Sequence, residues 1–342
     1  MATAQLGDEA AAAADMYGEG GVLSELEAEV ASLLGKPAAA FMPSGVMAQQ
    51  CVLRVWADRR GTKRVALHGL SHFVLHELDA LEAMHGLHLE HLSDEPRPAT
   101  AADLAGVPGH LAAASIELPL RDAGYLLPSW DELEAFADAC RERDVPLHID
   151  GARLWESAPY WDREPADVAA LADTVYVSFY KGLGGLAGAA VVGPQDVIDE
   201  ARRWQRRHGG TLITLLPYAV SARDGLRRHA PQMTRYRHAA VEVAATLSAR
   251  GLQVLPNPPH TNAFRVFAPI GADVVNERRL AHMEATLESV TRGFRPVEVP
   301  GWSMTEFTAG SATISAGAAV AGNRVADVIL GLDALDAPST GG

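Results

Sequence analysis

The sequence predicts an α/β fold in which a mostly parallel mixed sheet lies between helices and a small C-terminal α+β domain follows. Short apolar stretches alternate with amphipathic ones up to about residue 193, and such alternation is typical of a sheet covered by helices on both faces. After residue 217 the pattern is mainly helical, with only short strands. We therefore expect a large domain over residues 17–225, a small domain over 226–342 and a poorly ordered lead-in over 1–16.

The expected elements follow from the period of the apolar residues. A capping box of Ser129 and Glu132 opens a helix that reaches Arg143. Amphipathic spacing predicts other helices over residues 22–34, 71–86, 194–207, 275–291 and 325–335. Apolar runs predict strands over residues 38–41, 64–67, 112–118, 145–150, 174–179, 187–192, 252–255 and 262–267.

The composition is that of a globular protein with a small-molecule partner. Of the 342 residues, 48% are hydrophobic and 21% charged, which argues against disorder and allows a substantial core. The 29 basic and 43 acidic residues give a net charge of −14, whereas nucleic acids and anionic membranes favour positive patches. No apolar run approaches the length of about 18 residues that a transmembrane helix needs. We expect neither nucleic acid nor membrane as a partner.

The cysteine content and the charge of the N-terminal segment are typical of a cytoplasmic protein. Cys51 and Cys140 are too few for a disulfide framework, and their spacing fits no zinc motif. Asp8, Glu9 and Asp15 precede any basic residue, whereas a signal peptide begins with positive charge. We therefore expect a cytoplasmic protein.

Ser44 and Gly45 stand between a predicted strand and the helical spacing that follows it. Free backbone N–H groups and the helix dipole make such a helix start an anion site, so phosphate binding is one interpretation. An ordinary N-cap serine is the alternative, and it is the commoner use of serine at a helix start.

Lys181 follows the strand predicted over residues 174–179 and precedes Gly182 and Gly184. The glycines leave the backbone open, so the lysine amine could be presented to a carbonyl cofactor. The alternative is a solvated lysine on a surface loop.

Asp150 ends the strand predicted over residues 145–150, and Arg153 follows closely. Ligands bind at the carboxyl ends of strands in open α/β sheets, and Asp150 and Lys181 occupy equivalent places on consecutive strands. We therefore expect these two side chains to lie near each other. A helix start, a carboxylate and a lysine match the phosphate, ring nitrogen and aldehyde of pyridoxal 5′-phosphate.

Histidines crowd the segment from His68 to His91, and the spacing of His68, His72 and His76 raises the question of a metal site. The segment has no His-Glu-x-x-His order and no nearby cysteine pair. We expect packed or surface histidines and no metal.

Two sequence motifs together are specific for one protein family. They are the run His148–Leu154 (His-Ile-Asp-Gly-Ala-Arg-Leu) and the run Lys181–Gly184 (Lys-Gly-Leu-Gly). The chain resembles the low-specificity threonine aldolases of the β-eliminating lyase family, which are pyridoxal-phosphate enzymes of the aspartate-aminotransferase fold type (fold type I). Further matching stretches are Tyr17-Gly18, Leu26-Glu27, Pro43-Ser44-Gly45, Ser71-His72 with Glu77 and, more weakly, Thr261-Asn262.

The resemblance implies a role for each candidate residue. Lys181 would hold the cofactor as a Schiff base, and Asp150 would pair with its pyridine nitrogen. His72 would stack on the ring and act as base or orienter for the substrate β-hydroxyl. Arg153 would contact the phenolic oxygen or the substrate carboxylate. The phosphate would be bound by Ser44, Gly45 and the Val46 N–H.

The resemblance also implies an activity and an assembly. The reaction would be retro-aldol cleavage of a β-hydroxy-α-amino acid to glycine and an aldehyde. The assembly would be a homodimer or homotetramer with shared active sites, where Tyr17 reaches a neighbouring subunit's cofactor. β-Elimination, racemisation and transamination would use the same lysine and stay open. A metal-binding protein built on the histidines and a noncatalytic cofactor-binding protein are the remaining alternatives.

Several residues depart from the family pattern. Val46 replaces a threonine, so one hydroxyl donor to the phosphate is lost, and Tyr180 replaces the serine before the lysine. Where the family has Gly-Gly-Gly-Met-Arg, residues 209–213 lack the arginine. Threonine as the substrate therefore does not follow. Our hypothesis is that Arg121, which comes after a strand end, replaces a lost substrate-carboxylate contact.

Overall fold

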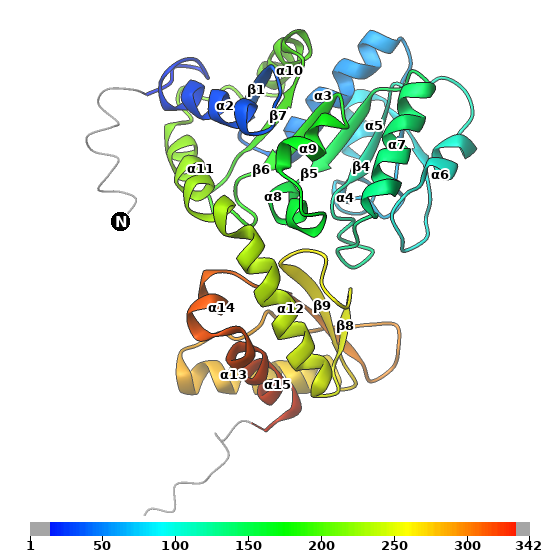
Figure 1. The fold of residues 1–342 in the computed structure, drawn as a ribbon. Coiled ribbons are helices and arrows are strands. Elements are labelled where there is room, and N and C mark those ends of the chain that lie inside the picture. Colours follow the sequence, from blue (N-terminus) through cyan, green and yellow to red (C-terminus); the bar gives the residue numbers. More distant parts are fainter. Residues whose placement is uncertain (1–13, 333–342) are drawn as a thin grey trace, which may run out of the picture. The chain divides into compact units, whose positions relative to one another are not determined.

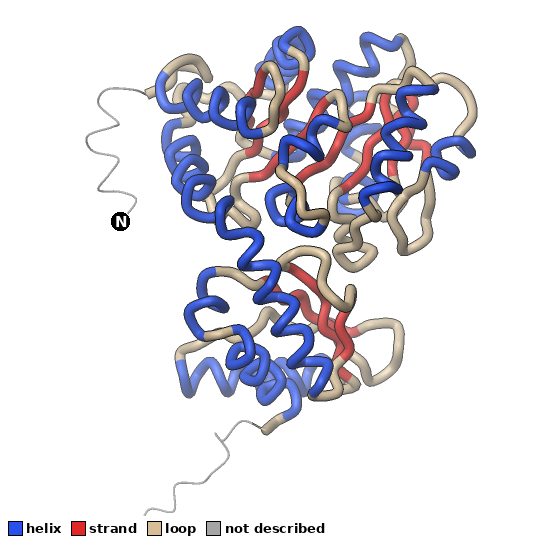
Figure 2. Tube along the Cα trace, viewed as in Figure 1, coloured by secondary structure: helices blue, strands red, loops and turns tan. Residues whose placement is uncertain are grey.

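The computed structural model describes residues 14–332, which form two compact units that divide between Gln232 and Met233. Figures 1 and 2 show the elements of each unit. The division expected at residue 225 would cut helix α11 (Leu216–His229), because the helix continues without a break to His229. None of the helices within residues 14–332 is long and apolar enough to cross a membrane.

The first unit is built on a seven-stranded sheet with the order β1-β7-β6-β5-β4-β2-β3. Strand β7 pairs antiparallel with β1 and β6, and the remaining pairs are parallel, so the predicted mostly parallel mixed sheet is confirmed. The strands are β1 (Ala38–Met42), β2 (Arg64–Leu67), β3 (His88–His91), β4 (Ala113–Glu117), β5 (Leu147–Gly151), β6 (Thr174–Ser178) and β7 (Ala189–Gly193).

Strand β3 is missing from the sequence prediction. Its residues His-Leu-Glu-His carry no apolar run, because β3 lies at the edge of the sheet and is only partly buried. The central strands are recognisable in the sequence because they are buried and apolar throughout, and this signal is weak at an edge.

Helices cover both faces of the sheet (Figure 1). Helices α3 (Gly45–Arg60) and α10 (Gln195–Arg207) share a hydrophobic core with alternate residues of the strands, Tyr176 of β6 among them. The other helices of this unit are α2 (Gly21–Leu33), α4 (His72–His76), α5 (Ala80–His85), α6 (Ala101–Gly106), α7 (Trp130–Glu142), α8 (Leu154–Ser157), α9 (Pro165–Ala170) and α11.

The single helix predicted over residues 71–86 is wrong. Two short helices, α4 and α5, take its place, because Leu78 and Asp79 between them have φ angles of 49° and 56°. Side chains other than glycine rarely adopt this left-handed region, and two in succession end a helix. The capping box predicted at Ser129 and Glu132 is present at the start of α7.

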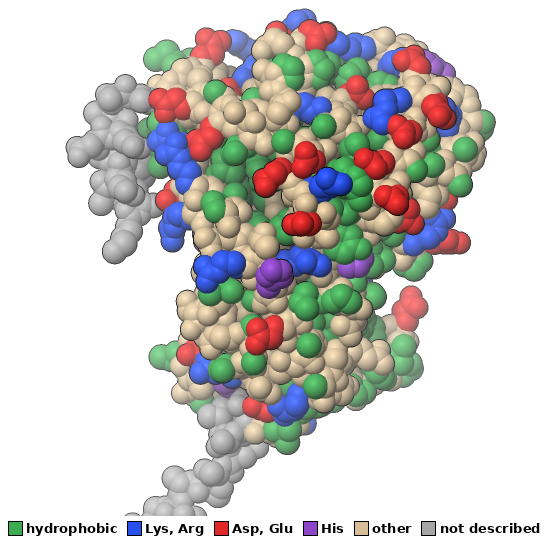
Figure 3. All heavy atoms as spheres, viewed as in Figure 1, with side chains coloured by type: hydrophobic (Ala, Val, Ile, Leu, Met, Phe, Trp, Pro, Cys, Tyr) green, Lys and Arg blue, Asp and Glu red, His purple; other side chains and the backbone are tan. Residues whose placement is uncertain are grey.

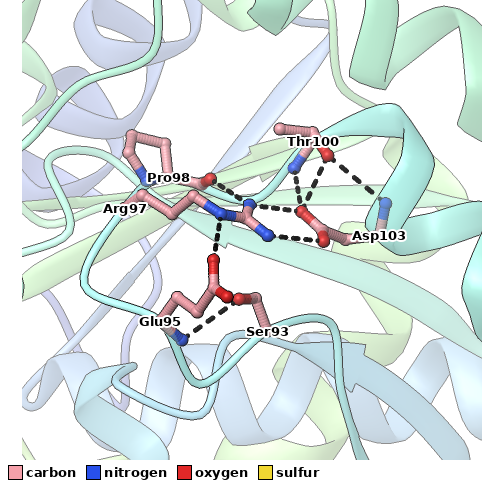
Figure 4. A network of polar contacts seen from close by, with 6 residues as sticks. All are labelled: Ser93, Glu95, Arg97, Pro98, Thr100 and Asp103. Atoms are coloured by element: carbon pink, nitrogen blue, oxygen red, sulfur yellow. Dashed lines mark hydrogen bonds and ion pairs between the residues drawn. The ribbon is translucent and has the colours of Figure 1, made fainter.

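A polar network orders the loop between β3 and α6 (Figure 4). The Arg97 guanidinium donates to both carboxylate oxygens of Asp103, at 2.7 and 2.9 Å, and to Glu95 at 2.7 Å. Asp103 also completes a capping box with Thr100 at the start of α6. The loop lies against Gly69, where an added Cβ would come within 1.8 Å of Asp94 Oδ1, so it supports the segment that leads into α4.

The second unit has the α+β composition predicted for the small domain. Its four-stranded sheet is antiparallel throughout, in the order β10-β11-β9-β8. The helix predicted over residues 325–335 begins earlier and ends at Leu330, and residues 333–335 lie outside the described residues. The elements are α12 (Met233–Ala249), β8 (Gln253–Leu255), β9 (Ala263–Ala268), α13 (Ala272–Thr286), β10 (Arg295–Pro296), β11 (Ser303–Thr308), α14 (Ser311–Ala316) and α15 (Ala318–Leu330).

The lead-in expected over residues 1–16 falls mostly outside the described residues. Its last part is more ordered than expected, because Asp15 is buried. The Asp15 carboxylate accepts hydrogen bonds from the Thr214 hydroxyl and the Leu215 N–H, both at 2.8 Å, and these bonds hold the segment on the first unit.

Candidate active site

An open pocket lies where the C-terminal ends of β4, β5 and β6 meet the start of α3. Most of the candidate residues from the sequence line it. They are Gly45, Val46, His72, Arg121, Asp150, Arg153 and Lys181. The pocket thus occupies the edge of the sheet where ligands bind in open α/β folds.

Asp150 lies near the end of β5 with its carboxylate buried. Gln49 Nε2 donates to Asp150 Oδ2 at 2.9 Å, and the Ala152 N–H donates to Oδ1 at 3.1 Å. Burial raises the pKa of Asp150, while these two donors and Lys181 oppose the rise. The carboxylate is therefore fixed in orientation toward the pocket.

Gln49 is a site residue that the sequence interpretation missed. It lies one helical turn after Gly45, so the i, i+4 spacing places both residues on the pocket side of α3. This spacing from Gly45 is the sequence feature from which Gln49 could have been predicted as a pocket residue. Its Oε1 atom is buried and has no hydrogen-bond partner within the described residues.

Lys181 lies on the turn after β6 and lines the pocket. Burial lowers the pKa of Lys181, the Arg153 guanidinium lowers it further, and Asp150 opposes them. A lowered pKa makes the neutral, nucleophilic amine more available. The turn itself is held by a 2.9 Å hydrogen bond from the Gly182 N–H to Glu156 Oε1, and a Cβ at Gly182 would lie 2.2 Å from that oxygen.

His72 begins α4, and its two ring nitrogens have different surroundings. Nδ1 lies 2.7 Å from Glu77 Oε1, so the imidazole donates its proton there and keeps a lone pair on Nε2. Burial lowers the pKa of His72 to about 4, and Lys181 and His76 contribute to the shift. A neutral imidazole with a lone pair can act as a general base at neutral pH.

Glu117, at the end of β4, is the second residue that the sequence interpretation missed. It pairs with Asp150 across the β4–β5 ladder, and it accepts hydrogen bonds from the backbone N–H groups of His72 (2.8 Å) and Arg121 (3.2 Å). Burial and the Asp150 charge raise the pKa of Glu117 to about 8. Two carboxyl groups therefore share this wall of the pocket, and each disfavours the charged form of the other.

Two arginines bring positive charge to the pocket. Arg153 NH1 lies 3.8 Å from Glu156 Oε1, and its guanidinium stands 5.4 Å from the centre of the Tyr125 ring. Arg121 NH1 lies 3.7 Å from Asp122 Oδ2. Guanidinium groups at such sites can bind a substrate carboxylate.

The start of α3 forms the anion-binding corner of the pocket. Gly45 and Val46 are the first residues of this sixteen-residue helix, whose first N–H groups lack intrahelical partners. Ser44 is the N-cap, does not line the pocket, and within the described residues its side chain makes no capping hydrogen bond. A Cβ at Gly45 would lie 2.1 Å from Tyr176 Oη, so glycine is needed here.

Tyr17 does not line the pocket formed by residues 14–332. Its backbone N–H donates to Ile213 O at 3.0 Å, and 57% of the residue is exposed. The structure therefore does not bring Tyr17 together with the other candidates within one chain.

The histidines of residues 68–91 are spread over several environments. His76 Nε2 lies 2.8 Å from Asp122 Oδ2, and His85 is buried beside the rings of Trp204 and His208. In the described part of the chain, no group of three or more histidine, cysteine or acidic side chains is arranged to hold a metal ion.

The residues present fit pyridoxal 5′-phosphate. The helix start at Gly45 offers backbone donors to a phosphate, Asp150 is held facing the pocket, and Lys181 presents an amine whose pKa is lowered. The donor set therefore matches the phosphate, ring nitrogen and aldehyde of this cofactor.

Comparison with known proteins identifies the family that the sequence motifs resemble. The model of the beta-eliminating lyase family matches residues 1–269. A Listeria monocytogenes structure described as a candidate L-allo-threonine aldolase has 35% identity and a TM-score of 0.89, over 96% of this chain and 91% of that one. Low-specificity L-threonine aldolase 1 of Arabidopsis thaliana is 26% identical over 82% of this chain and 81% of its own.

A third relative is an uncharacterized Caenorhabditis elegans protein, which is 29% identical over 61% of this chain. The chain spans about half of that relative, 51% of its length. The match to the family model covers well over half of this chain. The chain belongs to the beta-eliminating lyase family, whose members are pyridoxal 5′-phosphate-dependent lyases of fold type I.

Proposed function

We propose that the protein cleaves a β-hydroxy-α-amino acid, threonine-like in structure, to glycine and an aldehyde by a retro-aldol reaction. One observation carries the proposal: Lys181, Asp150 and the neutral His72 line a single pocket. The relatives named as L-threonine and L-allo-threonine aldolases support this choice of reaction.

The protein residues would divide the work of holding the cofactor. Lys181 would bond to its aldehyde carbon, Asp150 would keep its ring nitrogen protonated, and the first N–H groups of α3 would bind its phosphate. When bound, the cofactor supplies an electron sink for the charge that bond cleavage leaves at the substrate Cα.

His72 would act on the substrate itself. Its Nε2 lone pair would take the proton of the β-hydroxyl as the Cα–Cβ bond breaks, so that the β-carbon leaves as an aldehyde. Glu77 would hold the imidazole in the required tautomer, since it accepts from Nδ1. A pKa of about 4 keeps His72 unprotonated and ready at neutral pH.

Arg153 and Arg121 would bind the substrate carboxylate, since both line the pocket. We propose Arg121 as the replacement for a missing carboxylate contact, because its backbone is fixed by Glu117 at the end of β4. Arg121→Ala should raise KM for the accepted amino acids about tenfold, the loss of one charge-assisted contact. An unchanged KM for every accepted amino acid would contradict a role for Arg121 in binding the substrate carboxylate.

We further propose a cytoplasmic homodimer or homotetramer whose active sites are shared between subunits. The exposed apolar side chains of Met16, Tyr17 and Ile213 support an interface on the first unit, where the Tyr17 N–H donates to Ile213 O. On the face shown in Figure 3, acidic and basic side chains are interspersed. The buried thiols of Cys51 and Cys140 are compatible with a reducing compartment.

Light scattering after size exclusion tests the assembly. The wild-type protein should have two or four times the monomer mass, and Ile213→Glu should shift it toward the monomer because a buried charge at an interface is costly. Ser289→Glu, at an exposed residue of the second unit, is the control for added charge. A monomeric wild-type protein would contradict the assembly.

Product analysis tests the reaction. The holoenzyme is incubated with L-threonine, L-allo-threonine and other β-hydroxy amino acids, and glycine and aldehyde are quantified. We expect equimolar glycine and aldehyde from at least one substrate, and neither product from Lys181→Ala. A 2-oxo acid with ammonia would indicate β-elimination instead, and a 2-oxo acid without ammonia would indicate transamination.

A further inference from the structure

Hydroxyl groups gather on one face of β6 and its continuation. Tyr176 and Ser178 are alternate residues of β6, so their side chains point to the same side of the strand, and Tyr180 lies on the bend that follows it. Tyr176 and Tyr180 line the cofactor pocket. The hydroxyls of the three residues lie close enough to influence the pKa values of both tyrosines.

The Tyr176 hydroxyl lies against the first residue of α3. A Cβ added to Gly45 would come within 2.1 Å of Tyr176 Oη and 2.7 Å of Cζ. The phenol therefore occupies the space beside the helix start, where the first backbone N–H groups lack intrahelical partners. The strand and the helix thus bring a phenol hydroxyl and free backbone N–H groups to the same corner of the pocket.

The Tyr176 phenol remains a hydrogen-bond donor at neutral pH. Burial raises the pKa of Tyr176 well above its ordinary value, and the nearby Asp150 charge adds to the rise. Burial also raises the pKa of Tyr180. A neutral phenol carries one O–H donor, and a donor to a charged oxygen makes a stronger bond than one to a neutral acceptor.

The helix start itself offers no hydroxyl beyond Ser44. Val46, the second residue of α3, has a hydrocarbon side chain, so it contributes only its backbone N–H to an anion there. An anion at this corner would therefore find its side-chain donors on β6 rather than on α3.

We propose that Tyr176, with Tyr180 beside it, donates hydrogen bonds to the phosphate of the cofactor and so makes the pocket select the phosphorylated over the unphosphorylated aldehyde. This inference rests on the cofactor assignment above. It concerns which side chains of this chain recognise the phosphate, and it does not depend on which amino acid is cleaved.

The test compares Tyr176→Phe with the wild-type protein after removal of the cofactor. Dissociation constants are measured by titration for pyridoxal 5′-phosphate and for pyridoxal, which has the same ring and aldehyde without the phosphate. We expect the variant to bind pyridoxal 5′-phosphate about tenfold more weakly, the loss of one bond to a charged group, and to bind pyridoxal as before. Inorganic phosphate should also compete less well with the cofactor in the variant.

Tyr236→Phe is the matched control. Tyr236 is a buried tyrosine of the second unit whose hydroxyl lies 2.7 Å from Ser311 Oγ, so the same hydroxyl is removed outside the pocket. Both dissociation constants should stay at wild-type values. Tyr180→Phe, at a residue that is 43% exposed, serves as the second variant if Tyr176→Phe does not fold.

Equal weakening of both ligands in Tyr176→Phe, or no weakening of either, would overturn the inference, because the hydroxyl would then not act on the phosphate. A wild-type protein that binds neither aldehyde would instead overturn the cofactor assignment. The two failures are thus distinguishable.

Discussion

His72 illustrates how the surroundings of one residue decide its chemistry. Its Nδ1 faces the Glu77 carboxylate at 2.7 Å, while burial and the nearby cations disfavour the imidazolium form. A histidine in water has a pKa of about 6.5 and is partly protonated at pH 6. In this pocket His72 stays in its neutral, basic form to a lower pH than a histidine in water does.

The protonation of His72 can be followed by NMR in protein freed of cofactor. We expect the His72 ring resonances, assigned by their loss in His72→Asn, to titrate with a midpoint of about 4. The sign follows from burial, which opposes the charged form and so lowers the pKa. A midpoint at or above 6 would contradict the proposed base.

Lys181, Asp150 and Gly45 were accessible from the sequence, because each marks the end of a strand or the start of a helix. Gln49 and Glu117 were not recognised, because their contributions depend on how elements pair. Glu117 is opposite Asp150 only once the β4–β5 register is known. The positions of Tyr176 beside Gly45 and of Glu77 beside His72 likewise require side-chain geometry.

At the scale of elements, one hydroxyl links α3, β5 and β6. Trp56 Nε1 donates to Thr174 Oγ1 at 3.2 Å, and the Thr174 hydroxyl lies 3.0 Å from His148 Nδ1. All three residues are buried. The link fixes the strand that carries Asp150 against the strand that leads to Lys181.

Thr174→Val should therefore destabilise the protein by about 2 kcal/mol, because it leaves the Trp56 N–H and the His148 nitrogen buried without this partner. Urea unfolding measures the change. Thr174→Ser keeps the hydroxyl and should retain most of the stability. A valine variant as stable as wild type would show that the hydroxyl does not stabilise the fold.

His148 on β5 also predicts a dependence of stability on pH. Burial lowers the pKa of His148 to about 3, so between pH 6.5 and 3 the unfolded chain binds a proton that the folded chain does not. Its stabilising contribution is complete above the unfolded pKa and is lost as the pH falls. From pH 7 to 5, the loss is about 2 kcal/mol.

The measurement is the free energy of unfolding in urea at pH 7 and pH 5. Carboxyl groups with raised pKa, such as Glu117, act in the opposite direction, so wild type is compared with His148→Asn. The change in unfolding free energy from pH 7 to pH 5 should be less favourable in wild type than in the variant by about 2 kcal/mol. Equal changes in the two proteins would contradict the lowered pKa of His148.

At the scale of the whole molecule, the sequence pattern anticipated the fold class better than its internal boundaries. The alternation of strands and helices predicted the mixed sheet, because central strands are buried and apolar throughout. The edge strand β3 and the break between α4 and α5 were missed, since neither has an apolar signature. The expected division at residue 225 stays a prediction, and the compact units divide at Gln232.

The reactivity of the two cysteines tests whether the helices of the first unit stay closed in the native state. Cys51 in α3 and Cys140 in α7 are buried, and burial raises the pKa of each thiol to about 12. Since the thiolate is the reactive form, neither should react with a disulfide reagent at pH 8 in the native state. Both should react in urea. Rapid reaction of one thiol in the native protein would show that its helix opens locally.

The covalent role of Lys181 can be tested directly, because the chain contains three lysines, Lys36, Lys63 and Lys181. Holoenzyme is reduced with borohydride, digested and mapped by mass spectrometry. The mass of the reduced cofactor should appear on the peptide containing Lys181 and should be absent from Lys181→Arg. A label on Lys36 or Lys63, or no label in protein loaded with the cofactor, would contradict this role.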